Sequence, residues 1–475
     1  MKIDRRHFFK KSSLLSIFGA SALAAGQQSQ NKQSVRITEE VPVIDETDVC
    51  VIGGSCTGVF AAIRAARLGA RVTIIEKQSA FGGVATNSLV NVWHSLYDTE
   101  YKQQIIAGLT LEAIELLKKR DAVEIIPNNP SVGEKFNPHD LKIVLDNMVL
   151  EAGITPWLHT VFSAPVLDES GKLAGIVVEN KSGRGCIKAK MFIDASGDGD
   201  LCHRLGLTEY TFENLNPPTT CALLEGWEEV GPVINDLLKE HREEFDLPEG
   251  FIWGGYIPHS KNFMMAGTRV YNVNCDDARD LTHAEIEGRR QVSMIMEIVK
   301  KYTDQHLTLT GLPSNIGIRE TRHIKCRHQV TSDEILYGKR FPDAIANGSY
   351  RVDIHHQDKP GITFKYLDGT QVYNRPGYPE QVSRWREKTD TNPTFYQIPL
   401  SSLLPPKYDN LVLAGRMLDA EQAAFSGVRV MVNMNQTGEA AGTAAVLAME
   451  QNQAINRVSP ADVRKSLEKG GSIIF

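Results

Sequence analysis

The sequence predicts an α/β fold in three layers around a parallel central sheet, interrupted by an inserted α+β domain. Two observations carry this prediction. Residues 48–76 alternate strand, glycine-rich turn, helix and strand, and the same alternation returns over residues 410–449. Between them, residues 206–399 lose this rhythm. Alternating strands and helices indicate a parallel sheet, and an interrupted domain of this kind places its ligand crevice at the domain junction.

The first strand, turn and helix form a unit suited to a dinucleotide. A strand at residues 48–52 runs into a turn, and the helix expected over 59–68 is ended by Gly69. Small residues let the chain approach a pyrophosphate, to which the helix N-terminus offers free N–H groups. The next strand, 72–76, ends in an acid that can accept hydrogen bonds from a ribose diol. The residues predicted to bind a Rossmann-type dinucleotide here are Gly53, Gly54, Ser55, Cys56, Thr57, Gly58 and Glu76.

The glycine string alone is a weak signal. Ser55 stands where the G-x-G-x-x-G pattern has its middle glycine, and an ordinary strand–turn–helix also uses glycine for its turn. The flanking strand, the Ala-rich helix and the terminal Glu76 favour the dinucleotide interpretation. Both FAD and NAD satisfy this unit taken by itself.

The charge of the chain argues against a nucleic-acid partner. The 475 residues carry a net charge of −6. The first 24 residues hold five basic side chains against one acidic one, so their removal would leave a net charge of −10. A strongly acidic chain without a basic stripe repels a polyphosphate backbone.

The first 25 residues resemble a bacterial twin-arginine export signal. Arg5 and Arg6 precede a short, weakly apolar run over 14–23 and a small-residue cleavage site at 22–24. The alternative is a basic tail ahead of a membrane-anchored helix, but the run is too short to span a bilayer. We therefore expect export machinery as a partner, a periplasmic or otherwise exported location, no stable membrane anchor, and a flexible spacer at 26–42.

The cysteines give no metal or cluster motif. None of the seven forms a C-x-x-C pair, so neither an iron–sulfur cluster nor a structural zinc site has its usual spacing. Cys56, in the turn, is interpreted as a small residue, with a thiol activated by the helix dipole as the alternative. Asp198 and Asp200 follow a predicted strand but lack a third ligand, so no metal site is predicted.

The remaining elements are predicted from periodicity and turn signals. Helices are expected over 104–119, 140–152, 284–300 and 437–449, and strands over 156–164, 173–179, 188–193 and 410–414, with a hairpin turn at 182–183. Thr282 and Glu285 have the spacing of a capping box for the third of these helices.

Several blocks resemble the FAD-dependent oxidoreductases with the glutathione-reductase-like flavin fold. They lie at residues 48–58, 76–83, 193–200, 317–322 and 413–416. The subgroup is similar to the flavin subunit of heterodisulfide reductases, but this chain lacks the cysteines that would hold the iron–sulfur clusters. The resemblance implies FAD as the cofactor. No second glycine unit is present for a nicotinamide dinucleotide.

The resemblance also implies further cofactor contacts and domain boundaries. Arg416 would meet the pyrophosphate or the ribityl chain, and a helix starting in residues 426–438 would face the pyrimidine edge of the flavin. The added cofactor-binding residues are Lys77, Gly82, Gly83, Ala195, Ser196, Gly197, Gly415 and Arg416. The FAD-binding domain is expected at 43–206 and 400–455, the inserted substrate domain at 207–399, and a C-terminal tail at 456–475.

Flavin oxidation of a C–H bond needs a base for the departing proton and groups that bind the substrate. Arg319, or Arg322 nearby, is suited to a substrate carboxylate or an oxyanion. The alternatives are structural histidines and an ion pair of Glu320 with these arginines. His94 is also a candidate for covalent flavin attachment. The candidate catalytic residues are His94, Arg319, His355, His356 and Tyr396.

The sequence thus predicts an FAD-dependent dehydrogenase or oxidase. It would oxidise a small polar substrate, a sugar or a hydroxy acid, by hydride transfer to flavin N5, and pass the electrons to an external acceptor. One alternative is a reductase of an unsaturated acid, fed by a separate donor and using an arginine as proton donor. The other is a flavin-binding electron-transfer module without a substrate of its own.

Overall fold

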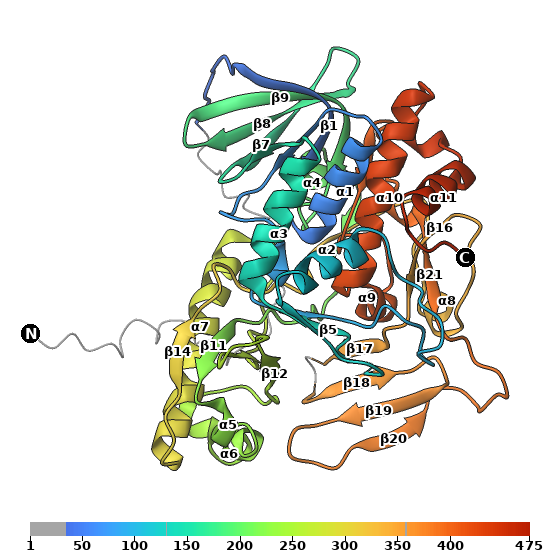
Figure 1. Cartoon of the computed structure of the whole chain (residues 1–475). Coiled ribbons are helices and arrows are strands. Elements are labelled where there is room, and N and C mark those ends of the chain that lie inside the picture. The colour runs from blue at the N-terminus through green and yellow to red at the C-terminus, as the bar shows by residue number, and fades with distance from the viewer. Residues whose placement is uncertain (1–34, 130, 357–358) are drawn as a thin grey trace, which may run out of the picture. The chain divides into compact units, whose positions relative to one another are not determined.

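A seven-stranded sheet is the largest in the described part of the chain, and Figure 1 shows four of its strands, β1, β7, β8 and β9, at the top. The computed structural model describes residues 35–129, 131–356 and 359–475. Five strands run parallel in the order β6-β2-β1-β9-β22, so the C-terminal return joins the sheet of the N-terminal unit as predicted. Their bounds are β6 Thr155–Trp157, β2 Val72–Ile75, β1 Val43–Ile52, β9 Gly183–Asp194 and β22 Leu411–Leu413.

The predicted strand–turn–helix–strand unit is confirmed, with a helix that begins earlier than expected. α1 spans Cys56–Arg67, and its N-cap is Ser55, whose hydroxyl accepts a hydrogen bond from the N–H of Gly58. Gly53 has φ +101°, a left-handed conformation that glycine adopts without steric cost. The serine cap explains why the helix starts at residue 56 rather than at 59.

An antiparallel extension, β7-β8-β9, continues the sheet beyond β9. β7 spans Val161–Leu167 and β8 spans Leu173–Asn180, and β8 turns into β9 at the predicted hairpin. The single strand predicted over 156–164 is wrong. It is divided between β6 and β7, because the chain turns at His159, which has φ +51°.

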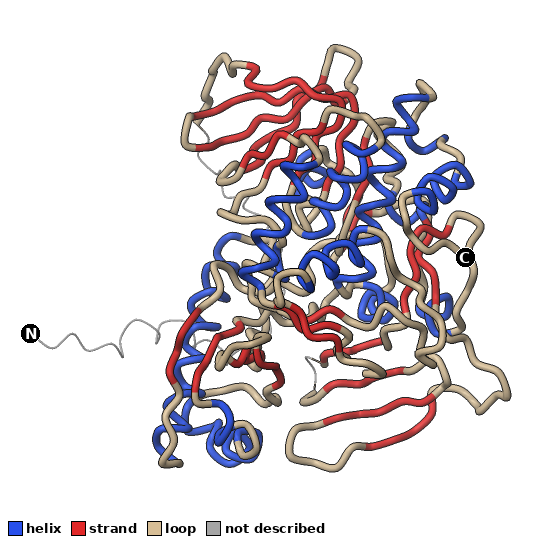
Figure 2. Tube along the Cα trace, in the orientation of Figure 1, coloured by secondary structure: helices blue, strands red, loops and turns tan. Residues whose placement is uncertain are grey.

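Helices from both ends of the chain pack together beside the parallel strands (Figures 1 and 2). α2 is shorter than the helix predicted at 104–119, because Gly108, with φ +67°, immediately precedes it. α10 includes the helix predicted at 437–449 and begins six residues before it. The bounds of this group are α2 Leu109–Lys118, α3 Pro138–Glu151, α10 Met431–Glu450 and α11 Pro460–Lys469.

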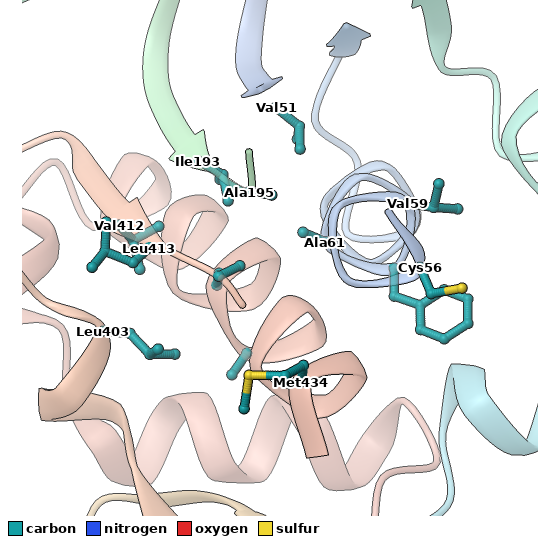
Figure 3. Packing of buried hydrophobic residues seen from close by; sticks show 14 of the residues in the cluster. Val51, Cys56, Val59, Ala61, Ile193, Ala195, Leu403, Val412, Leu413 and Met434 are labelled. Atoms are coloured by element: carbon teal, nitrogen blue, oxygen red, sulfur yellow. The ribbon is translucent and has the colours of Figure 1, made fainter. Parts of the chain in front are cut away.

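Glycine lets α1 and α10 approach one another closely. A Cβ on Gly438 would lie 2.1 Å from the carbonyl oxygen of Thr57, and a Cβ on Gly442 would lie 2.2 Å from that of Ala61. Since both sets of residues advance along the chain in the same direction, the two helices run parallel. Their N-termini therefore point toward the same end of the molecule. The two helices pack within a core of small and aliphatic side chains (Figure 3).

Residues between the two halves of this α/β unit form small antiparallel sheets in the orders β12-β13-β11-β14, β17-β18-β19-β20, β16-β21 and β10-β15. A further sheet, β3-β5-β4, lies earlier in the chain. The strands are β3 Val92–Trp93, β4 Val123–Ile125, β5 Glu134–Phe136, β10 Glu209–Tyr210, β11 Cys221–Glu225, β12 Trp253–Tyr256, β13 Phe263–Ala266, β14 Thr308–Gly311, β15 His323–Ile324, β16 Ala344–Gly348, β17 Val352–His355, β18 Ile362–Lys365, β19 Thr370–Asn374, β20 Gln381–Arg384 and β21 Tyr396–Pro399.

The long helix of this region, α7, spans Ala278–Tyr302 and corrects a prediction. Its N-cap is Asp277, whose carboxylate accepts hydrogen bonds from two backbone N–H groups of the first turn. The capping box predicted at Thr282 and Glu285 is therefore wrong, since Thr282 lies inside the helix. The other helices are α4 Asp200–Arg204, α5 Trp227–Val230, α6 Ile234–His241, α8 Ser332–Leu336 and α9 Gln422–Val428.

The predicted export signal at 1–25 and the first part of the spacer lie outside the described residues. Residues 35–42 form neither helix nor strand. None of the helices in the described part of the chain is long and apolar enough to cross a membrane.

Candidate functional site

The glycine turn between β1 and α1 forms a backbone cradle. A Cβ on Gly53 would lie 2.4 Å from the carbonyl oxygen of Ala195, and a Cβ on Gly54 would lie 2.5 Å from the ring of Phe81. The chain therefore has room only for glycine at these two positions. The first turn of α1 opens onto this cradle with free N–H groups and the positive end of the helix dipole.

Glu76 supports the cradle from the end of β2. One carboxylate oxygen accepts the N–H of Gly54 at 2.6 Å, and the other accepts the N–H of Gln78 at 2.8 Å. Each oxygen of an ionised carboxylate can accept more than one hydrogen bond. Glu76 is thus fixed in place and keeps acceptor capacity for the predicted ribose contact.

The second glycine pair closes the other side of the turn. Gly82 and Gly83 have φ +106° and +55°, and the N–H of Gly82 donates to the carbonyl of Gly54 at 2.8 Å. The Cys56 thiol donates to the carbonyl of Gly82, and burial raises the pKa of this thiol to about 12. This supports the interpretation of Cys56 as a small buried residue rather than an activated thiol.

The segment after β9 crosses next to the cradle, as predicted. Asp194 accepts hydrogen bonds from the hydroxyl and the N–H of Ser196, which holds the turn of residues 195–197. Arg416, which follows β22, forms an ion pair with Asp198, while its Nε is buried without a hydrogen-bond partner. Lys77 lies close enough to lower the pKa of Asp198, along with Arg416 and against the effect of burial. A basic pair therefore lies near the cradle, where a pyrophosphate is expected.

The start of α10 forms the second helix N-terminus of the site. Its N-cap, Val430, supplies no side-chain bond to the first turn. The Oδ1 atom of Asn433, in this turn, is buried without a hydrogen-bond partner, while its Nδ2 donates to the hydroxyl of Tyr396 at 3.1 Å. A polar ligand with a donor group would satisfy Asn433 here.

A polar cluster around Asp353 lies next to this helix start. Asp353 and His355 share one face of β17, and α9 packs against this strand. The carboxylate of Asp353 contacts His355 Nε2 at 3.3 Å, Arg429 Nη2 at 3.4 Å and the Tyr350 hydroxyl at 3.0 Å. Burial alone would raise the pKa of this carboxyl, but His355, Arg429 and Arg351 hold it well below its usual range. Asp353 is therefore ionised at neutral pH.

His94 and His355, both predicted catalytic residues, face this cluster as neutral imidazoles. Burial lowers the pKa of His355 to about 4, although Asp353 opposes the shift. Burial and the charge of Arg351 lower the pKa of His94 to about 3. His94 lies edge-on to Tyr350, with ring centroids 4.1 Å apart, and its Nδ1 is buried without a partner.

Arg319, also predicted, approaches the cluster from the segment before β15. Its guanidinium donates to the carbonyl of Pro217 and to the hydroxyl of Thr219. Burial, together with the positive charges of Arg429 and Arg269, lowers its pKa to about 10. The hydroxyl of Thr219 donates in turn to the carbonyl of Thr268, which places Arg319 close to Arg269.

Two predicted residues make other contacts. The hydroxyl of Tyr396 donates to the carbonyl of Gly427 at 2.8 Å, and burial raises its pKa, so its contacts join β21 to α9. His356 hydrogen bonds the hydroxyl of Thr363 at 2.7 Å rather than Asp353. It does line the same small cavity as His355 and Arg269.

Five residues of this cluster were not among the predicted site residues, namely the charged residues Arg269, Arg351, Asp353 and Arg429 and the neutral Tyr350. A signal was available for one of them. In a strand, side chains two residues apart share a face, so Asp353 was expected to lie beside His355 once β17 was recognised. The other members come from distant segments that carry no shared pattern.

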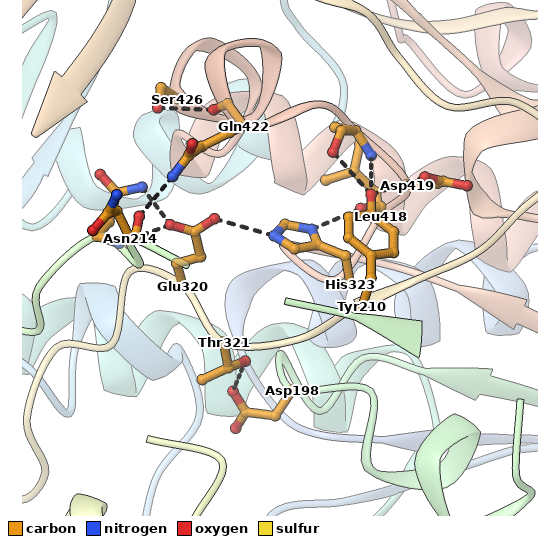
Figure 4. A network of polar contacts seen from close by, with 12 residues as sticks. Asp198, Tyr210, Asn214, Glu320, Thr321, His323, Leu418, Asp419, Gln422 and Ser426 are labelled. Atoms are coloured by element: carbon orange, nitrogen blue, oxygen red, sulfur yellow. Dashed lines mark hydrogen bonds and ion pairs between the residues drawn. The ribbon is translucent and has the colours of Figure 1, made fainter. Parts of the chain in front are cut away.

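Residues 320–323 form a separate buried network (Figure 4). Glu320 accepts hydrogen bonds from the N–H and the side chain of Asn216, and it contacts Nε2 of His323 at 3.2 Å. Arg322 pairs with Asp276 at 3.2 Å. The ion pair considered between Glu320 and the arginines is therefore replaced by these contacts.

No group of three His, Cys, Asp or Glu side chains in the described part of the chain is arranged to hold a metal ion. Asp198 accepts a hydrogen bond from Thr321 at 2.9 Å and pairs with Arg416. All seven cysteines are free.

A family model and several known proteins match this sequence. A sequence model of a protein family described as "FAD dependent oxidoreductase" matches residues 48–467. Dihydrolipoamide dehydrogenase of Chaetomium thermophilum is 31% identical over 131 residues, which cover 22% of this chain and 25% of that protein. A probable mitochondrial electron transfer flavoprotein-ubiquinone oxidoreductase of Saccharomyces cerevisiae is 22% identical over 293 residues, covering 54% of this chain and 46% of that protein. The matches thus span from a quarter to just under half the length of these relatives.

A similar solved structure is a geranylgeranyl bacteriochlorophyll reductase-like protein from Thermoplasma acidophilum. It is 14% identical, covers 90% of this chain and 83% of its own, and has a TM-score of 0.41.

Gly53→Ala is expected to abolish retention of the dinucleotide, because the new Cβ would collide with the carbonyl of Ala195 at a residue with φ +101°. The visible flavin absorption of the purified chain, relative to its protein absorption, measures retention. Ser55→Gly is the matched control. It restores the glycine pattern, should cost only about 0.3 kcal/mol as an N-cap change, and should keep the flavin. A folded Gly53→Ala protein as yellow as the wild type would contradict the placement of the cradle.

Proposed function

Because this chain belongs to the FAD dependent oxidoreductase family, we propose that it oxidises a small polar substrate, a sugar or a hydroxy acid, and passes the electrons to an external acceptor. The observation that carries this proposal is the buried pair of Asp353 and His355 beside the start of α10. It supplies the base that oxidation of a hydroxyl-bearing carbon requires.

FAD is the cofactor, and the residues of the cradle fit it. Gly53 and Gly54 keep side chains out of the place where a pyrophosphate approaches, and Glu76 is positioned for the adenosine ribose. Arg416 and Lys77 supply positive charge, and Asn433 has an unsatisfied acceptor at the second helix N-terminus. When bound, FAD supplies at flavin N5 the two-electron acceptor for the hydride of the substrate.

We propose that the proton of the neutral His355 ring lies on Nε2, the nitrogen next to Asp353. Nε2 lies 3.3 Å from Oδ1 of Asp353 without hydrogen-bond geometry, and the charge of the carboxylate favours the proton on this nitrogen, which leaves Nδ1 as the basic nitrogen. Nδ1 would then accept the hydroxyl proton of the substrate as the hydride leaves the same carbon. The ionised Asp353 stabilises the imidazolium that forms. Tyr350 and Arg429, which also contact Asp353, hold the carboxylate in position.

Reduction of an unsaturated acid, with electrons fed to the flavin by a separate donor, is a second candidate, and one observation favours it. Arg319 has a pKa lowered to about 10, which makes its guanidinium a stronger acid than usual while it stays protonated at neutral pH. Such a group suits the protonation of an unsaturated acid during reduction. The direction of electron flow separates the two candidates, since only the oxidation reduces the flavin when substrate alone is added.

The purified holoenzyme, mixed anaerobically with sugars and hydroxy acids, should lose its flavin absorption with a true substrate. His355→Asn and Asp353→Asn should each slow this bleaching about 100-fold or more. In the wild type the rate should stay level from neutral pH down through about 6.5, where an ordinary histidine titrates. It should fall only toward pH 4, because His355 remains the neutral base until it is protonated near its lowered pKa of about 4.

His283→Gln, on the exposed face of α7, is the control variant and should bleach like the wild type. A protein bleached only by a chemical reductant, and then reoxidised by an unsaturated acid, would refute the oxidation and support the reductase.

We further propose that the chain is exported in the folded state by the twin-arginine route, because the FAD site needs the folded backbone to hold its ligand. Replacing Arg5 and Arg6 by lysine should leave yellow, folded protein in the cytoplasm, measured by cell fractionation and flavin absorption. Unchanged export of this variant would point to the route that carries unfolded chains.

A further inference from the structure

We propose that the substrate is a hydroxy acid, and that its carboxylate is bound by an arginine cluster made of Arg269, Arg319, Arg351 and Arg429. This inference rests on the proposed function, because it names the substrate class of the same site. It selects between the sugar and the hydroxy acid, which the Asp353–His355 pair alone does not distinguish.

The four arginines come from separate parts of the chain and are linked by contacts to the Asp353–His355 pair. Arg269 follows β13, Arg319 precedes β15, Arg351 precedes β17, and Arg429 lies between α9 and α10. Arg429 contacts Asp353 directly at 3.4 Å. The guanidinium of Arg351 lies over the ring of Tyr350, whose hydroxyl donates to Asp353, and Arg269 lines a small cavity together with His355. Arg319 donates to the hydroxyl of Thr219, which in turn donates to the carbonyl of Thr268, next to Arg269. These contacts place the four guanidinium groups around the Asp353–His355 pair.

The positive charge of this cluster is not balanced by the described residues that face it. Of the four guanidinium groups, only that of Arg429 contacts a carboxylate in the described part of the chain, that of Asp353 at 3.4 Å. Glu249 lines the small cavity with Arg269, but Arg375 holds it in a two-point ion pair at 2.6 and 3.0 Å. His94 and His355 remain neutral at neutral pH and neither add nor remove charge. Buried charge without a partner is costly, so an anionic ligand is expected here.

Three other buried or partly buried arginines of this chain each form an ion pair with a carboxylate, which balances their charge. Arg64 pairs with Glu439, Arg322 with Asp276 and Arg416 with Asp198. In the cluster, by contrast, Arg269 donates to the backbone carbonyls of residues 267 and 251, and Arg319 donates to a carbonyl and a hydroxyl. Neutral oxygens satisfy the hydrogen bonds of a guanidinium but leave its charge in place.

Two donors of the cluster are also unused. The Nε atoms of Arg351 and Arg429 are buried without a hydrogen-bond partner. The guanidinium of Arg351 stacks on aromatic rings, with its carbon 4.1 Å from the ring centre of Phe364. This stacking fixes the orientation of its N–H donors before a ligand binds. Guanidinium groups bind carboxylates in charge-assisted, two-point hydrogen bonds. A carboxylate on the carbon next to the oxidised one would thus place the hydroxyl near His355.

Equilibrium binding to the oxidised holoenzyme tests this inference. The probes are lactate and gluconate, with lactamide and glucose as their uncharged counterparts, followed by the flavin absorption difference spectrum and by dialysis. The acids should bind at least about tenfold more tightly than the uncharged probes, which is the difference expected for one charge-assisted contact.

Variants locate the contact. Arg319→Gln and Arg351→Gln should each weaken binding of the acid about 10- to 100-fold and leave the uncharged probes unaffected. Arg319→Lys should recover part of the loss, because it keeps the charge but not the planar fork. Arg289→Gln, on the solvent face of α7, should bind like the wild type. FAD content and melting temperature establish that each variant is folded.

Equal binding of acids and uncharged probes, or full binding of the acid by Arg319→Gln and Arg351→Gln together, would overturn the inference. Its failure is separable from that of the proposed function. Bleaching by a neutral sugar with no preference for acids keeps the oxidation and removes the carboxylate subsite. Tight binding of acids without any bleaching keeps the subsite and removes the oxidation.

Discussion

The close contact of α1 with α10 is the constraint on which the site depends. Gly438 and Gly442 let the two helices touch backbone to backbone, and Arg64 forms a buried ion pair with Glu439 in the same region. Loss of one partner of such a pair leaves a buried charge and is strongly destabilising. Because the helices run parallel, their N-termini open toward one end of the molecule. The cofactor cradle and Arg429, just before α10, are placed together by this single interface.

The part of the fold that depends on local chemistry could be predicted from the sequence. Gly53, with its left-handed backbone, and Glu76, at the end of β2, mark the dinucleotide unit because turn, helix and acid must follow one another at short spacing. The return of the same alternation near residue 411 predicted that the two ends of the chain build one sheet. The predicted helix boundaries were less accurate. Several polar residues near a helix start can serve as its N-cap, and the sequence does not show that Asp277 is the one used.

The polar cluster was largely beyond prediction for a physical reason. His94, Arg319 and His355 were candidates because of their residue types, but nothing in the sequence indicated that they lie together. In the sequence, Asp353 cannot be told apart from other acidic residues in polar segments. Only its burial and its contact with Arg429 in the folded chain mark it as part of the site. Such clusters are made by tertiary contacts between segments far apart in the chain, and no periodic pattern records them.

The central claim is that the cradle of α1 and the cluster around Asp353 serve one flavin from its two ends. A crystal structure of the holoenzyme with a bound hydroxy acid tests it most directly. The adenosine ribose should lie at Glu76, the flavin ring at the start of α10, and the acid between that ring and His355. A flavin ring directed away from β17, or an acid bound outside the arginine cluster, would contradict it.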